Sequence, residues 1–179
     1  MSWLGAVPTL PGGHGAAHVD ALLLAALDDV PAGFVCTHTD RLGPVAVTTL
    51  SAHVTGEVDV DRLSAALGGP VAVDVDPDSP ASRAARAGRE RTDGRCIRFP
   101  GQSALTGTHP AAEVVAGSAI DRVVGIGVPV APTDLVETLG FLRPVCQDGE
   151  LVLLVEPAVG GVLRPVEAES PHECCGGGH

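Results

Sequence analysis

The chain has 179 residues but no tyrosine and no lysine, one tryptophan and only three phenylalanines. Base-stacking surfaces that hold single-stranded nucleic acids need aromatic side chains, which are nearly absent here. All 11 basic residues are arginines, and the 22 acidic residues bring the formal net charge to -11, which repels a phosphate backbone. The composition therefore argues against a nucleic-acid-binding protein. It also predicts a core built from valine, leucine and alanine.

Long apolar runs are missing as well. The longest candidate, residues 21–27, is far shorter than the roughly 20 residues that span a bilayer. The opening MSWLGAVPTLPGG has neither a positively charged start nor a long apolar stretch, so it does not resemble a secretory signal. Five cysteines, an odd number, predict free or metal-bound thiols rather than a disulfide framework. We therefore expect a cytoplasmic protein without membrane insertion.

The apolar periodicity predicts one α+β domain over residues 1–166 and a Cys/His/Gly-rich tail at 167–179, with α/β as the alternative fold class. Residues 1–13 are expected to form an irregular lead. Helices are predicted at 14–29, 59–67, 79–88, 110–115 and 133–137. Strands are predicted at 33–39, 45–50, 71–75, 95–99, 122–130, 140–146, 150–156 and 162–166. The turn at 147–149 predicts a C-terminal hairpin in a mixed sheet of roughly five to seven strands.

The strongest local signal is the segment HECCGGGH at 172–179. His172, Cys174, Cys175 and His179 offer imidazoles and thiolates, which are the ligands that zinc, nickel and copper prefer. The glycines allow the backbone to fold tightly around an ion. Neighbouring cysteines differ from the usual zinc-knuckle spacing, so the identity of the metal stays open. The alternative interpretation is a glycine-rich end with incidental cysteines.

A second group of metal-binding residue types lies near the start of the chain. His14 and His18 are four residues apart in a predicted helix and share one face. Cys36 and His38 are two apart in the following strand and also share a face. The helix and the strand have matching lengths of about 16 Å, so a turn near Pro31 would bring the two pairs level.

The sequence leaves several arrangements of these residues open. The four could form one metal site, or the tail could supply Cys174 or Cys175 to His14 and His18. In the simplest alternative, Cys36 is a small core residue.

Six arginines at 83–98 face only two acids there, giving a local charge of +4. Arg83, Arg86 and Arg89 follow helical spacing, and guanidinium groups bind carboxylates and phosphates through paired hydrogen bonds. They are candidate anion ligands for a small substrate or an acidic protein partner, which includes a second copy of this chain. The alternative is a solvated helix face.

The HECCGGGH segment resembles the Cys/His/Gly-rich metal-binding tails of some bacterial nickel-handling chaperones. The resemblance covers about eight residues and implies metal binding only for them. The leading hypothesis is accordingly a protein that handles, delivers or senses a transition metal. Two alternatives remain: an accessory subunit of a larger complex, and an enzyme on a small anionic substrate with Cys36 or Cys146 as nucleophile.

Overall fold

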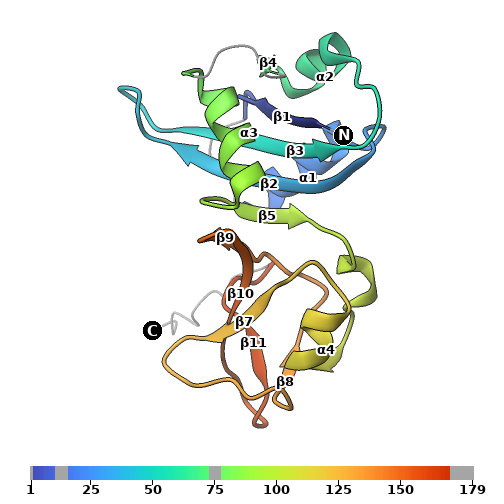
Figure 1. Ribbon diagram of the computed structural model, residues 1–179, viewed down its shortest axis with the longest axis vertical. Coiled ribbons are helices and arrows are strands. Elements are labelled where there is room, and N and C mark those ends of the chain that lie inside the picture. Colours follow the sequence, from blue (N-terminus) through green and yellow to red (C-terminus); the bar gives the residue numbers. More distant parts are fainter. Residues whose placement is uncertain (1, 11–15, 73–77, 170–179) are drawn as a thin grey trace, which may run out of the picture.

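The computed structural model describes residues 2–10, 16–72 and 78–169 and confirms the α+β prediction (Figure 1). One mixed sheet of eleven strands is accompanied by four short helices in the described part of the chain. The helices are α1 (Ala16–Ala26), α2 (Val60–Leu67), α3 (Pro80–Glu90) and α4 (Ala111–Ala116), with a 3-10 turn at Gln102–Ala104. The first five strands are β1 (Ser2–Ala6), β2 (Ala32–Asp40), β3 (Val47–Val54), β4 (Val71–Ala72) and β5 (Arg95–Arg98). The others are β6 (Thr108–Pro110), β7 (Arg122–Gly125), β8 (Leu135–Glu137), β9 (Val145–Gln147), β10 (Glu150–Pro157) and β11 (Leu163–Pro165).

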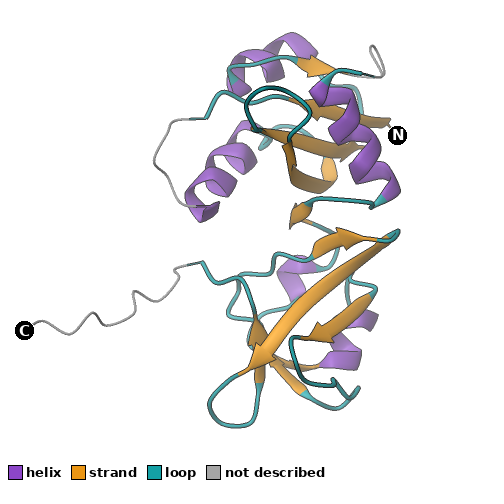
Figure 2. Ribbon diagram, turned by 90° about the vertical axis from the view of Figure 1, so that its left-hand side faces the viewer, coloured by secondary structure: helices purple, strands orange, loops and turns teal. Residues whose placement is uncertain are grey.

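The strand order divides the sheet into two halves. It runs β4-β1-β3-β2-β5-β9-β10-β11-β8-β6, with β7 added beside β10. Strands β1–β5 with α1, α2 and α3 make the upper half in Figure 1, and β6–β11 with α4 make the lower half. Figure 2 shows the same division from the side. The halves join where β5 pairs with β9 at Arg95 and Val145.

The upper half has a helix-covered face on each side of its sheet. Leucine, valine and alanine side chains from β1, β2 and β3 pack with Leu23 of α1, with Leu27 just after that helix, and with Leu63 and Leu67 of α2. The opposite face is covered by α3, which lies so close that a Cβ at Gly5 would fall 1.7 Å from the carbonyl oxygen of Ala81. Glycine is thus required at the contact between β1 and α3.

The lower half has its own apolar core, and this core includes three cysteines at the junction with the upper half. Val114 of α4, Val136 of β8 and Leu151 of β10 are among its fully buried members. Cys36, Cys96 and Cys146 belong to the same cluster, from β2, β5 and β9 respectively. The three neighbouring strands at the junction therefore meet around sulfur atoms.

Several element predictions are confirmed, among them the hairpin of β9 and β10 around residues 147–149. Other predictions are wrong: the strand expected at 140–146 is confined to β9 at Val145–Gln147, and the strand expected at 122–130 ends at Gly125. The expected irregular lead contains β1, which lies between β3 and β4 in the sheet. The expected helix at 133–137 is instead β8, which pairs with β6 and β11. The strand count also exceeds the expected five to seven, because short pieces gain stability from sheet partners that a local pattern does not contain.

Candidate functional site

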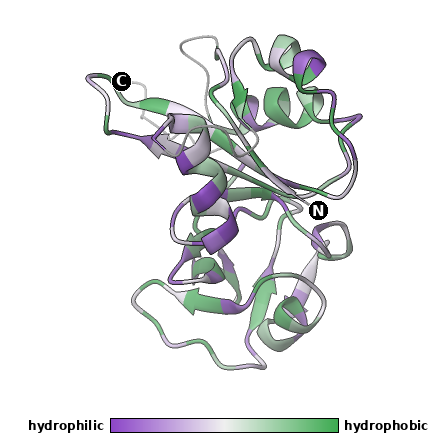
Figure 3. Cartoon of the chain, turned by 45° about the horizontal axis from the view of Figure 1, so that its top comes forward, coloured by the Kyte–Doolittle hydropathy of each residue, from purple (hydrophilic) through white to green (hydrophobic). Residues whose placement is uncertain are grey.

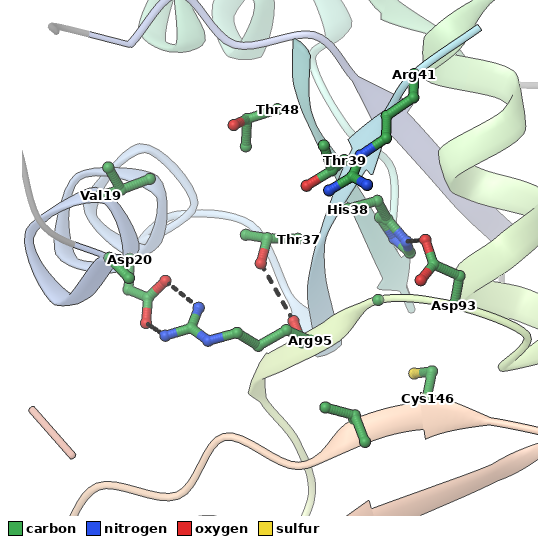
Figure 4. Close-up of a pocket in the computed structure, with 13 residues that line it drawn as sticks. Val19, Asp20, Thr37, His38, Thr39, Arg41, Thr48, Asp93, Arg95 and Cys146 are labelled. Atoms are coloured by element: carbon green, nitrogen blue, oxygen red, sulfur yellow. Dashed lines mark hydrogen bonds and ion pairs between the residues drawn. The ribbon is translucent and has the colours of Figure 1, made fainter. Parts of the chain in front are cut away.

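A cavity of about 840 Å³ lies at the junction of the two halves (Figure 4). Its wall combines the first turns of α1, the end of β2, the chain entering β5, and β9. The hollow exists because β5 pairs only with residues 35–37 of β2, whereas β2 continues to Asp40. Most of the lining residues are polar or ionisable, and they include Asp20, His38, Asp93, Arg95 and Cys146.

A buried ionic network closes one side of the cavity. Asp20 of α1 is 1% exposed, and its carboxylate accepts hydrogen bonds from Arg95 at 2.6 and 2.7 Å and from Arg143 at 2.6 Å. Arg95 also donates to Glu167, at 2.7 Å from Nε to Oε1. Burial alone would lower the pKa of Arg95, but the bonds to Asp20 and Glu167 outweigh burial and raise it. The network therefore joins α1, β5 and the residues that follow β11.

His38 lies deeper, between the sheet and the turn before β5. Its Nε2 is 2.8 Å from the hydroxyl of Ser51, while its Nδ1 lies 3.9 Å from the carboxylate of Asp93, beyond hydrogen-bond distance. A Cβ at Gly94 would fall 2.5 Å from the imidazole, so the glycine lets the chain pass against the ring. Burial lowers the pKa of His38, and the charge of Asp93 only partly opposes it. The ring is therefore neutral at pH 7.

The three cysteines beneath the cavity differ in their surroundings. The sulfurs of Cys36 and Cys146 are 3.9 Å apart, and the thiol of Cys96 donates to the carbonyl of Arg98 at 3.1 Å. The pKa of Cys36 is raised, mainly by its hydrogen bond with Cys146. The pKa of Cys146 is lowered by the bond from Cys36 and by the charge of Arg91, against the effect of burial. Cys146 is therefore the sulfur that ionises first in this pair.

No thiol–imidazole pair stands out at the cavity. The two nitrogens of His38 are directed at Ser51 and Asp93 rather than at Cys146. The predicted nucleophiles Cys36 and Cys146 thus face each other and not a base. This arrangement does not favour the enzyme hypothesis.

The structure brings together only some of the predicted metal ligands. Cys36 and His38 share a face of β2, as expected, but that face is turned toward α3, whereas His18 lies exposed on α1 across the sheet. The residues His14, His172, Cys174, Cys175 and His179 lie outside the described residues, so the predictions that involve them are not tested. Within 2–10, 16–72 and 78–169, no three His, Cys, Asp or Glu side chains are grouped so that they would hold a metal ion.

The candidate anion ligands lie along α3, where Figure 3 shows hydrophilic stretches interrupted by paler and hydrophobic ones. Arg83 is already paired, because its Nε and Nη2 lie 2.8 and 2.6 Å from Asp40. The pKa of Asp40 is lowered, first by the N–H of Leu42 and then by Arg83. Arg86 and Arg89 are exposed, and Arg89 lies 3.6 Å from Glu90. Of the three predicted ligands, Arg86 and Arg89 are the better candidates for an external anion.

The sequence reasoning missed Asp20, which is the centre of the ionic network. A signal for it exists: Asp20 is the one acid inside the apolar helix 16–26, and such an acid needs a buried cation. The identity of that cation was not readable, since Arg95 and Arg143 are 75 and 123 residues away along the chain.

Comparison with protein-family models, curated proteins and solved structures finds no match to this chain. Similarity therefore assigns no function, and inference depends on the residues themselves. No helix in the described part of the chain is both long enough and apolar enough to cross a membrane.

Proposed function

We propose that this protein binds a transition-metal ion, zinc, nickel or copper, and hands it on or senses it. The ligands come from His172, Cys174, Cys175 and His179, completed by His14 and His18. Thiolates and neutral imidazoles suit these metals, and adjacent cysteines let two thiolates engage one ion. The need for reduced thiols favours the cytoplasm as the place of action.

One observation supports the composite arrangement: Arg95 bonds Glu167 and Asp20 at the same time. Glu167 is seven residues before Cys174, so the cysteine lies at most about 25 Å of extended chain from this anchor. Asp20 is two residues after His18, about 3 Å along the helix axis. The base of the Cys/His/Gly-rich segment is thus fixed beside the helix turn that contains His18.

The chemistry favours metal handling over metal-assisted hydrolysis. A catalytic zinc ion needs an open coordination position and a nearby general base. Glu173 is the sole carboxylate within the segment 172–179, and its neighbours are themselves the proposed ligands. A site rich in thiolates on a glycine-rich segment is better suited to transfer of an ion between proteins.

Element analysis of protein purified without a histidine tag tests the proposal. We expect about one equivalent of a single transition metal per chain, and loss of most of it in Cys174→Ala plus Cys175→Ala. His109→Ala, in the lower half, is the matched control and should retain the metal. Less than about a tenth of an equivalent, unchanged by the double substitution, would contradict metal binding.

A competition titration with a chromophoric chelator tests the composite site. Zn²⁺ affinity should fall about tenfold or more in His18→Ala, because an imidazole ligand is lost, and less in Glu167→Gln, which only loosens the anchor. His109→Ala again provides the control. Full affinity in His18→Ala, with loss in the double cysteine variant, would restrict the site to the segment 172–179.

The accessory-subunit alternative is favoured by one separate observation. Leu42 and Val45, in the connection between β2 and β3, are 79% and 71% exposed. Exposed aliphatic side chains at the tip of a hairpin are a typical contact with another protein. Light scattering behind size exclusion, on wild type and on Leu42→Asp plus Val45→Asp, tests this alternative. A monomer in both, with no co-purifying protein in the wild type, would contradict it.

A further inference from the structure

Cys36, Cys96 and Cys146 come from three neighbouring strands and meet at the junction of the halves. Cys36 and Cys96 face each other directly between β2 and β5. A contact also forms between strands that are not neighbours: the sulfurs of Cys36 and Cys146 are 3.9 Å apart across β5. A contact of this kind brings two thiols together without any bond between them.

The three thiols differ in access. Cys36 and Cys96 are 1% and 0% exposed, whereas Cys146 lines the cavity of about 840 Å³. Figure 4 shows the Cys146 side chain at the lower edge of that cavity, on β9. A small solute that enters the cavity therefore meets Cys146 before either of the other two.

The pKa values of the thiols also distinguish Cys146 from Cys36. The hydrogen bond between the two sulfurs and the positive charge of Arg91 lower the pKa of Cys146, while the same hydrogen bond raises the pKa of Cys36. Cys96 is directed at the carbonyl of Arg98, 3.1 Å away. One thiolate-prone sulfur at the cavity wall, 6% exposed, is thus backed by a more deeply buried thiol that is 1% exposed.

We infer that Cys146 is a site of reversible oxidation by peroxides and that Cys36 is the thiol that converts the oxidised form to a disulfide between β2 and β9. This inference is independent of the metal proposal, since it uses none of the residues of the segment 172–179. It also gives a role to an ionisable pair that the metal proposal leaves unused.

The oxidation takes two steps, formation of a sulfenic acid on Cys146 and formation of the disulfide with Cys36. The Cys146 thiolate attacks one oxygen of hydrogen peroxide, the S–O bond forms as the O–O bond breaks, and hydroxide leaves. The Cys36 sulfur then attacks the Cys146 sulfur, the S–S bond forms, and the S–O bond breaks. The hydroxyl group departs with the Cys36 proton as water. Cys36 and Cys146 are oxidised together by two electrons, and the peroxide is reduced to water.

The bond requires the sulfurs to close from 3.9 Å to about 2.05 Å, and because β5 lies between β2 and β9, these two strands must also shift toward each other. Both strands hydrogen-bond to β5, and the N–H of Cys146 is held by the carbonyl of Gly94 at 2.8 Å. The disulfide therefore fixes the two halves of the sheet to each other beside the cavity. Reduction by a thiol would release them.

Peptide mapping after peroxide treatment tests the inference in a Cys174→Ser plus Cys175→Ser background, which keeps the three buried cysteines native. Arginine-specific cleavage separates Cys36, Cys96 and Cys146 into different peptides. We expect the peptide ending at Arg41 to be joined to the one containing Cys146, with loss of two hydrogen atoms, and separation by dithiothreitol. A link to Cys96 instead, or no link at peroxide levels that oxidise a free cysteine, would overturn the inference.

Two further measurements separate the roles of the thiols. In Cys36→Ser, the sulfenic acid should persist on Cys146 and react with dimedone, while Cys96→Ser, the matched control, should still form the disulfide. In the unsubstituted core, iodoacetamide at pH 7 should modify Cys146 at least about tenfold faster than Cys96, which requires no core variant to fold. Equal rates for the two would contradict the assignment of Cys146 as the reactive site.

Discussion

The guanidinium of Arg95 holds the carboxylate of Asp20 through two parallel hydrogen bonds, of 2.6 and 2.7 Å. Asp20 lies on α1 and Arg95 begins β5, at the residue where β5 meets β9. Arg143 adds a third bond to the same carboxylate, so Asp20 ties α1 to both halves of the sheet. The cavity owes one of its walls to this arrangement.

Replacing Asp20 should be among the most damaging single changes in the chain. Asp20→Ala leaves two partly buried guanidinium groups without their shared anion, and we expect the free energy of unfolding to fall by about 3–5 kcal/mol. Chemical denaturation measures the change. Asp29→Ala removes the exposed pair with Arg62 and is the control, with an expected loss of no more than about 1 kcal/mol. Equal losses in both variants would contradict the importance of the buried network.

The neutral His38 should make the fold sensitive to mild acid. Its pKa is lowered in the folded state, so the unfolded chain binds more protons below a pH of about 6.5, and stability falls as the pH drops through that value. The slope contributed by one proton approaches about 1.4 kcal/mol per pH unit. Denaturation midpoints between pH 7.5 and 5 should show this slope, and His38→Gln should reduce it. An unchanged slope in His38→Gln, with His109→Gln as the control, would contradict the prediction.

Two glycines at the contact between α3 and the sheet should not tolerate a methyl group: Gly5 on β1 and Gly88 on α3. A Cβ at Gly5 would lie 1.7 Å from the Ala81 carbonyl oxygen, and one at Gly88 would lie 2.2 Å from the Ser51 hydroxyl. Gly5→Ala and Gly88→Ala should each lower the free energy of unfolding by about 3 kcal/mol, as expected for overpacking. Gly33→Ala is the matched control, because no atom lies within 4 Å of its added Cβ. Thermal melting of the three variants checks the order, and a Gly5→Ala protein as stable as Gly33→Ala would contradict it.

The alternation of side chains along β2 shows how far local reasoning reaches. A period of two correctly predicts that Cys36 and His38 share a face. The face itself depends on partners: Val35 packs with Leu23 of α1 and with Leu27, which follows that helix, so the even positions turn toward the other side. The same reasoning placed the start of α1 level with the end of β2, where the cavity lies. It did not reveal that the sheet separates His18 from His38.

Short elements show where local reasoning fails. A three-residue strand such as β8 has almost no periodicity of its own and exists because β6 and β11 supply hydrogen-bond partners. β1 is a strand for the same reason, between β3 and β4. Both lie in segments where the nearby prolines and short length predicted something else.

The sequence by itself determined the α+β class, the longer helices and strands, the C-terminal hairpin, and the clustering of thiols and imidazoles at 172–179, because each depends on composition or on spacing within a few residues. Only the tertiary structure decided that Asp20 meets Arg95, 75 residues away, and that Cys36 meets Cys146, 110 residues away. Such contacts are set by sheet order and by helix placement. These depend on the packing of the whole chain, and no local pattern contains them.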